Sequence, residues 1–249
     1  EAFPMAKIYG DEKTVKDEIA KIKSLPWKEK FPYIWEYYKL WIVGTILVAA
    51  CAISIALSVI ENSKPVLISG ILVNNFQNNS EEEVFSTNFA EYLGQNLNDV
   101  HVNLSTNMIL TPGSMDENTY ASVQKISVQV VARDLDFISS DESVVHYYCA
   151  TDDPENIIYA NLQQVLPEDI FQTLDSQGKI LYSNDINGNR FPAAIDMAGT
   201  RYYEDAKIGT TYCYVGCMIN APHKQNFVNL VRYAFHMELP EGIDPTAES

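Results

Sequence analysis

One uninterrupted apolar segment, Trp41 to Ile60, constrains this chain more than any other part of its sequence. No charged residue lies between Lys39 and Glu61, and ten of the residues from 41 to 60 are Ile, Leu or Val. As a helix, residues 40–60 would span roughly 31 Å, which matches a hydrocarbon core of about 30 Å. The ten aliphatic side chains contribute roughly −3 to −6 kcal/mol to membrane insertion. The segment is therefore predicted to be a transmembrane helix.

A cleaved signal peptide is the competing interpretation of this segment. Its apolar region would be about 7 to 15 residues long and would follow a short basic stretch. Here the apolar region is longer, and it is preceded by residues 1–40. A retained membrane anchor is therefore expected.

The distribution of charge predicts the orientation of the anchor. Residues 1–40 carry eight Lys, whereas residues 61–80 carry only Lys64. The positive-inside bias places the N-terminus in the cytoplasm and the C-terminal domain outside the cell, as a single-pass protein of the cell membrane. Residues 62–249 hold nine basic and 25 acidic side chains. This acidic balance argues against nucleic acid as a partner, because phosphate binding needs the opposite sign.

Residues 1–40 form the predicted cytoplasmic arm. An amphipathic helix is expected at residues 11–24, and Pro26 ends it. Aromatic residues then alternate with Lys, which is typical of an anchor at the lipid interface. The predicted interfacial residues are Trp27, Phe31, Tyr33, Trp35, Tyr37, Tyr38 and Trp41. The lipid bilayer is thus the expected partner, and docking to another membrane subunit is the alternative.

A linker at residues 61–65 leads to an extracellular domain at 66–238, and residues 239–249 are expected to be a flexible tail. In the first half of the domain, apolar runs and helical periodicity alternate in a β-α-β-α-β order. The expected strands are 66–74, 100–104 and 135–139, and the expected helices are 81–96, 117–133 and a short one through Tyr148, capped by Ser140 or Asp141. This order predicts an α/β or α+β domain with a mixed sheet.

The second half of the domain is more broken. An extended segment at 161–166 precedes a helix that begins at Pro167 and runs through Leu174. Residues 180–186 and 189–193 flank Asn187-Gly188, which predicts a hairpin with a two-residue type I′ turn. A strand at 212–220 and a helix at 224–237 complete the expected elements.

A succession of motifs within residues 120–197 resembles a known family. The helix YASVQKISVQVVARD enters the strand LDFIS, and SDESVVHYY, NLQQVLPEDI and FPAAIDM follow. This succession is similar to bacterial extracellular solute-binding proteins of the periplasmic-binding-protein type II kind. The order of arm, span and domain also resembles uncharacterised membrane-anchored proteins of Gram-positive anaerobes. Because a full second lobe does not fit in this length, the resemblance implies a shortened, one-lobed relative.

The resemblance implies a ligand site where the third strand of the domain meets the following helix. The candidate ligand-binding residues there are Asp136, Ser139, Ser140 and Asp141, and Asp196 near a second strand edge is a further candidate. Exposed N–H groups at a helix start would suit a polar ligand.

Few other residues point to chemistry. The four His residues are scattered without metal-ligand spacing, and no nucleotide-binding or hydrolase motif is present. No metal, cofactor or enzymatic activity is therefore expected. Cys213 and Cys217, four apart on a strand, would lie roughly 13 Å from each other, too far for a disulfide. Either could pair with Cys149, although buried free thiols are favoured.

Two functions remain open at this point. The first is a non-enzymatic, membrane-anchored binding or sensing module that contacts a small polar ligand or a partner membrane protein such as a transporter. The second is a structural accessory subunit that docks a membrane complex through its transmembrane helix and aromatic arm and has no ligand of its own.

Overall fold

The protein was analysed as a computed structural model. It describes residues 20, 22–75, 82–114, 116–150, 158–185, 187–240, 242 and 244–246, without the side chains at 28, 31, 33, 34, 36–38, 82, 83 and 107. The chain divides into two compact units, Glu1–Ser63 and Lys64–Ser249. Most of the predicted amphipathic helix at 11–24 lies outside the described residues.

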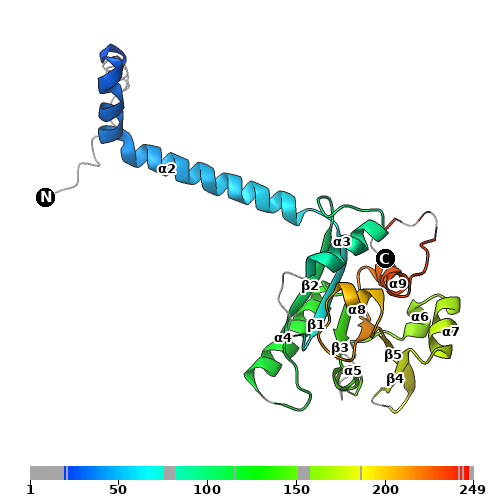
Figure 1. Ribbon diagram of the computed structural model, residues 1–249. Coiled ribbons are helices and arrows are strands. Elements are labelled where there is room, and N and C mark those ends of the chain that lie inside the picture. The colour runs from blue at the N-terminus through cyan, green and yellow to red at the C-terminus, as the bar shows by residue number, and fades with distance from the viewer. Residues whose placement is uncertain are drawn as a thin grey trace. The chain divides into compact units, whose positions relative to one another are not determined.

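The first unit is dominated by one long helix, α2, which runs from Trp27 to Asn62 (Figure 1). Pro26 precedes it in an extended conformation, and its carbonyl oxygen accepts hydrogen bonds from the N–H groups of Glu29 and Lys30. The segment Lys39–Asn62, 24 residues long, is apolar enough to cross a membrane, and none of its most apolar window is buried among the described residues. The helix therefore joins the predicted span, part of the aromatic arm and the first linker residues into one element.

Among the predicted interfacial aromatic residues, Trp27, Trp35 and Trp41 are exposed on α2. The side chains of Phe31, Tyr33, Tyr37 and Tyr38 lie outside the described part of the chain.

The second unit is built on a six-stranded sheet with the order β2-β1-β3-β6-β5-β4. The strands are β1 (Val66–Val73), β2 (His101–Met108), β3 (Phe137–Ser140), β4 (Ile180–Asn184), β5 (Arg190–Asp196) and β6 (Tyr214–Cys217). β1 pairs in parallel with both β2 and β3, whereas all pairs from β3 through β6 to β4 are antiparallel. The predicted mixed sheet is therefore confirmed.

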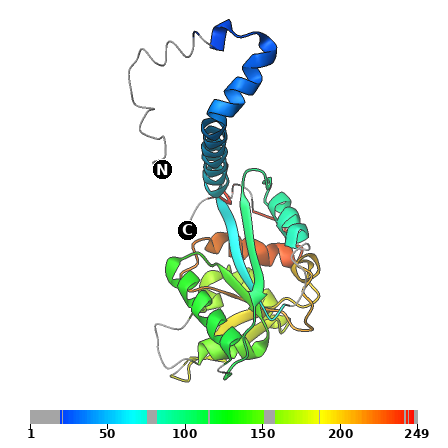
Figure 2. The ribbon, with the colours of Figure 1, turned by 90° about the vertical axis from the view of Figure 1, so that its left-hand side faces the viewer.

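Helices pack against the sheet and connect its strands (Figure 1). They are α3 (Glu82–Tyr92), α4 (Glu117–Ala132), α5 (Glu142–Cys149), α6 (Leu162–Val165), α7 (Glu168–Ser176), α8 (Arg201–Asp205) and α9 (Lys224–Ala234). Figure 2 shows α3 and α4 on opposite sides of β1 and β2, as expected when two crossover connections run in opposite directions along a sheet. Polar residues of β1 and α4, among them Ser69 and Gln129, line a cavity at this part of the sheet.

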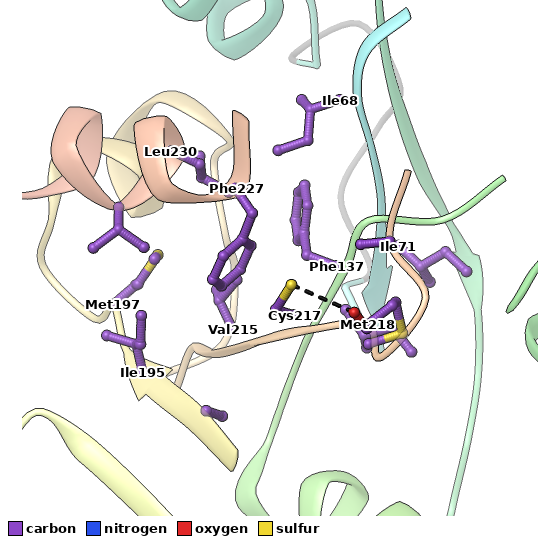
Figure 3. Close-up of a cluster of buried hydrophobic side chains, with 14 of the residues drawn as sticks. Ile68, Ile71, Phe137, Ile195, Met197, Val215, Cys217, Met218, Phe227 and Leu230 are labelled. Carbon is purple, nitrogen blue, oxygen red and sulfur yellow. Dashed lines mark hydrogen bonds between the residues drawn. The ribbon is translucent and has the colours of Figure 1, made fainter. Parts of the chain in front are cut away.

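The core is a continuous apolar cluster between the sheet and the helices. Figure 3 shows Phe137 of β3 and Phe227 of α9 within one group of buried side chains, beside Val215 and Cys217 of β6. Aromatic rings extend this cluster, because Tyr202 of α8 stands edge-on to both Phe137 and Phe85.

Two glycines permit close contacts between a strand and an aromatic ring. A Cβ atom on Gly70 would lie 2.1 Å from the Phe137 ring, and one on Gly216 would lie 2.4 Å from the Tyr159 ring. Both distances are far below van der Waals contact. These rings therefore cover the sheet only because no side chain stands at either position.

Several expected elements differ from the structure. Residues 162–165 form the short helix α6 rather than an extended segment, because the Asn161 side chain accepts from the Gln163 N–H and starts a helical turn. The predicted two-residue turn at Asn187-Gly188 is also wrong, because the Gly188 N–H donates to the Asp185 carbonyl and the Asp185 N–H donates to the Asn189 carbonyl, both at 2.9 Å. The Asp185 carboxylate instead accepts from the Asn189 N–H and holds a longer loop. β6 is shorter than the strand predicted at 212–220.

The end of the chain also differs from expectation. The sequence predicts a flexible tail from residue 239, but Pro245 is buried. Its carbonyl oxygen accepts a hydrogen bond from the Asn226 side chain of α9, at 2.6 Å. The described residues near 245 therefore belong to the packed domain.

The glycine contacts give a first prediction. Gly70→Ala and Gly216→Ala should each destabilise the domain by about 1–3 kcal/mol, because the new methyl group displaces a buried ring. The urea midpoint of unfolding measures this loss. Gly44→Ala in α2 is a matched control, since nothing lies within 4 Å of the added Cβ. Unchanged midpoints in both domain variants would contradict the prediction.

Candidate functional site

A buried carboxylate, Asp136, lies immediately before β3 and is 0% exposed. Its Oδ2 atom accepts from the Ser69 N–H of β1 at 2.8 Å, and its Oδ1 atom accepts from the His223 N–H at 2.7 Å. The His223 imidazole Nδ1 lies 3.0 Å from Oδ2, which fits an Nδ1–H donor. A buried carboxylate is tolerated only when its oxygens are hydrogen-bonded, and these three contacts meet that need.

The backbone of Asp136 continues this network. Its N–H donates to the Ser69 carbonyl, and its carbonyl accepts from the Met218 N–H, both at 2.8 Å. One residue thus connects β1, the start of β3 and the segment between β6 and α9. The candidate residue Asp136 is therefore a structural anchor that also orients His223.

A cavity of about 590 Å³ lies beside this pair, toward the amino-terminal ends of β1 and β3. Its size is within the range of about 300–1,000 Å³ that is typical of small-molecule sites. Most of the residues that line it are polar. The polar lining residues are Lys64, Ser69, Asn103, Ser105, Gln129, Arg133, Asp134 and His223.

Several polar side chains in this cavity have no partner in the described part of the chain. They are the Ser69 and Ser105 hydroxyls, the Asn103 amide and the Arg133 guanidinium, none of which contacts another described residue through a hydrogen bond or ion pair. Gln129 Oε1 is buried and likewise lacks a partner. Only the Gln129 Oε1 atom is buried, which is rare for a polar atom without a partner, whereas the other groups are partly or fully exposed and are available to water or a ligand.

Two of the cavity-lining side chains, Gln129 and Arg133, lie at the C-terminal end of α4. Arg133 caps the helix in the left-handed conformation, with φ of 59°, and its N–H donates to the Gln129 and Val130 carbonyls. This turn ends the helix at the cavity, so Gln129 and Arg133 both line its wall. The sequence contains no Gly at this cap, and this helix end therefore had no usual cap signal.

The other candidate residues lie at the opposite end of β3. Ser140 and Asp196 both pair in register with Tyr214 of β6, so they flank the same position of the sheet. Asp136 is four residues before Ser140, or roughly 13 Å along a strand. The five candidate residues therefore do not form one site.

Internal contacts also engage these residues. Ser139 Oγ lies 3.3 Å from Cys213 Sγ, and the Ser140 hydroxyl donates to the Asp141 carbonyl at 3.2 Å. Asp141 is the N-cap of α5, where its Oδ1 accepts from the Val144 N–H at 3.1 Å. The first-turn N–H groups at this helix start are thus partly satisfied by the protein itself.

Asp196 has a charged partner of its own. Its carboxylate contacts Lys179 Nζ at 3.0 Å and accepts from the Ala198 N–H at 3.0 Å. The ion pair is about one-third exposed, so it contributes little to stability. The Asp196 carboxylate thus stabilises the turn after β5 through contacts within the domain.

The carboxyl ends of β1 and β3 form the point at which open α/β sheets usually bind ligands. Here Asn74, directly after β1, fills this point. Its amide donates to the Leu110 carbonyl at 2.9 Å and to Asp141 Oδ2 at 3.3 Å, and it accepts from the Leu110 N–H at 3.0 Å. Within the described residues, the polar groups at this edge therefore serve to bind the loops to one another.

Hydrogen bonds connect Ser183, His146 and Glu142, an arrangement that the sequence did not predict. Ser183 Oγ of β4 lies 2.8 Å from His146 Nδ1, and His146 Nε2 lies 3.2 Å from Glu142 Oε1. Ser183 is buried, and it lines neither the cavity beside His223 nor the cavity beside α6 among the described residues. The contact links α5 to the edge strand β4.

A second cavity, of about 560 Å³, lies between α6 and the β4–β5 loop. Its lining includes Tyr159, Phe191 and Arg190, and the Arg190 guanidinium stacks 4.3 Å from the centre of the Tyr182 ring. Asp185 in the same wall is held by the Asn189 side chain. Its charged groups thus have partners within the domain.

The three cysteines of the domain are free and buried, which confirms the favoured prediction over a disulfide. Burial raises the pKa of the Cys149 thiol to about 11 and that of Cys213 to about 12. Burial also raises the pKa of Cys217. Since the thiolate is the reactive form, these side chains are packing groups near neutral pH. In the described part of the chain, no three His, Cys, Asp or Glu side chains cluster as metal ligands would.

The Asp136–His223 pair gives a second prediction. Asp136→Asn and His223→Ala should each lower the free energy of unfolding by about 3 kcal/mol, because each leaves a buried partner unsatisfied. The double variant should lose less than the sum, with a coupling of about 1–3 kcal/mol in a double-mutant cycle. Asp134→Asn, two residues away and exposed, is the control, with an expected change within about 0.5 kcal/mol. Strict additivity would show that the two side chains do not interact.

Comparison with protein-family models, curated proteins and solved structures finds no match to this chain. The resemblance to solute-binding proteins therefore stays a prediction, and function has to be inferred from the residues around the Asp136–His223 pair.

Proposed function

We propose that this protein is a single-pass, membrane-anchored and non-enzymatic module whose extracellular domain binds a small polar ligand beside His223. The observation that carries the proposal is the cavity of about 590 Å³ lined by polar side chains without partners among the described residues. Such groups can exchange hydrogen bonds to loosely held water for hydrogen bonds to a polar ligand. The cavity thus has both the volume and the chemistry of a polar binding site.

The proposed anchor rests on the length and composition of α2. A helix of 24 residues is about 36 Å long, enough to cross a hydrocarbon core of about 30 Å with some tilt. Its Ile, Leu and Val side chains are exposed on every side, which is unfavourable in water. The excess of Lys before the helix supports a cytoplasmic N-terminus.

Binding is favoured over catalysis at this cavity. Nucleophilic catalysis by serine requires a hydrogen bond from the hydroxyl to a base. Neither the Ser69 nor the Ser105 hydroxyl makes such a bond with any described residue, so neither is activated. The His223 Nδ1 is engaged by Asp136, which fixes the ring as part of the cavity wall.

Membrane anchoring gives a third prediction. Val48→Lys with Ile55→Lys should prevent stable insertion, because each central Lys opposes insertion by about 2.5–3.5 kcal/mol and together they cancel the gain from the aliphatic residues. The unmodified chain should stay in the membrane pellet after alkaline carbonate extraction, whereas the double-Lys variant should be released. Val48→Leu with Ile55→Leu is the matched control and should remain. Release of the unmodified chain would refute the anchor.

Ligand binding gives a fourth prediction, measured on the full chain in a neutral detergent. Glycerol, glucose, glycine and glycerol 1-phosphate serve as probes of polar chemistry. At a concentration of 100 Kd, a ligand should stabilise the folded state by about 2.7 kcal/mol, which raises Tm by about 5–10 °C for a domain of this size.

Cavity-filling variants control this measurement. Ser105→Trp should abolish the rise in Tm, and Gln164→Trp, which fills the second cavity, should retain it. If no probe stabilises the domain and a membrane protein co-purifies only when residues 27–62 are present, the accessory-subunit function replaces this proposal.

A further inference from the structure

The donors in the cavity suit an oxyanion. Lys64 and Arg133 bring two cationic side chains to its wall, and the Ser69 and Ser105 hydroxyls are uncommitted donors among the described residues. Guanidinium and hydroxyl donors together form strong, charge-assisted hydrogen bonds to phosphate oxygens. A carboxylate or phosphate is therefore better matched to this part of the wall than a neutral ligand.

The same cavity also contains hydrogen-bond acceptors, which hydroxyl groups on a ligand would satisfy. Gln129 Oε1 is buried without a partner, and the Asp134 carboxylate lines the rim. The Gln129 oxygen and the Asp134 carboxylate accept hydrogen bonds, and both would repel the oxygens of a phosphate that has no hydroxyl group. A ligand that carries both phosphate and hydroxyl groups satisfies donors and acceptors together.

The charge of the domain affects how such a ligand would arrive. Residues 62–249 carry nine basic against 25 acidic side chains, so a freely diffusing anion meets a repulsive field. A ligand held in the same membrane as the protein meets the same field, but its high effective concentration at the site offsets the repulsion.

The covalent structure keeps the cavity close to the apolar segment. Lys64 lines the cavity and lies four residues after Ile60, the last aliphatic residue of α2. Four residues of chain reach at most about 14 Å. Lys64 in the cavity wall therefore lies within about 14 Å of the end of the apolar segment, for any relative placement of the two units.

We propose that the cavity beside His223 binds a hydroxyl-bearing phosphate ester, either the head group of a phospholipid such as phosphatidylglycerol or a soluble polyol phosphate. Arg133, Ser69 and Ser105 hold the phosphate oxygens, and Gln129 and Asp134 accept from the hydroxyl groups. This inference rests on the proposed function, since it names the ligand of the same cavity.

The test uses the full chain in nanodiscs. Discs of phosphatidylcholine alone are compared with discs that also contain phosphatidylglycerol or, as a control for surface charge, phosphatidylserine. The Tm of the domain is measured in each, and glycerol 1-phosphate is titrated into the phosphatidylcholine discs. Phosphatidylglycerol or glycerol 1-phosphate, or both, should raise Tm. The responding probe identifies the source of the phosphate ester.

Variants assign the effect to the cavity. Arg133→Gln should weaken the affinity for glycerol 1-phosphate about tenfold, as expected for loss of a charged donor. Arg190→Gln, an exposed arginine outside this cavity, should leave the affinity unchanged. Ser69→Ala with Ser105→Ala repeats the test without altering the helix cap at Arg133.

Three results would overturn the inference. They are an equal effect of phosphatidylserine, an unchanged affinity in the cavity variants, and a response to glycerol or glucose without any response to the phosphate ester. The last result leaves the proposed function intact, whereas no response to any probe removes both.

Discussion

The second unit depends on how the buried Asp136 carboxylate is satisfied. Its oxygens accept hydrogen bonds from Ser69 of β1 and from His223, the residue before α9. Its backbone N–H donates to the Ser69 carbonyl, and its backbone carbonyl accepts from Met218, the residue after β6. All of these distances are 3.0 Å or less. Removing a charge from water is unfavourable by several kcal/mol unless such partners are in place. The network therefore ties the parallel half of the sheet to the antiparallel half where the two meet, at β3 and β6.

The same network explains why the cavity exists where it does. Asp136 fixes the segment Pro222–His223 against β1, and the left-handed cap at Arg133 ends α4 on the other side. Polar residues on β1 and β2 remain uncovered between these two boundaries. At the carboxyl edge, by contrast, Asn74 and Asp141 are hydrogen-bonded to each other. The domain thus uses its polar groups for structure at one edge of the sheet and leaves them open near the other.

Much of the fold could be predicted from local patterns. The apolar run at 41–60, the alternation of strands with helices and the free buried thiols all depend on residues close in sequence, and the structure has the corresponding elements. The candidate site could not be predicted in the same way. Asp136 was predicted as a ligand-binding residue, but its hydrogen bonds in the structure involve His223, 87 residues later, and no local signal connects the two. Similarly, Ser140 and Asp196 come together only through Tyr214, which requires the order of the strands.

The strand order has a consequence for how the domain assembles. β4 and β5 are joined by a short loop, so their pairing closes little chain, whereas Phe137 pairs with Cys217 across about 80 residues. The entropy lost on closing a loop grows with its length, and contacts between distant segments slow folding. The β4–β5 hairpin can therefore form early in folding. The β3–β6 pair is expected to form late, because the long segment between these two strands must first be brought together. Because the Asp136–His223 contact accompanies that late closure, a partly folded chain can contain strands and helices before the cavity beside His223 has formed.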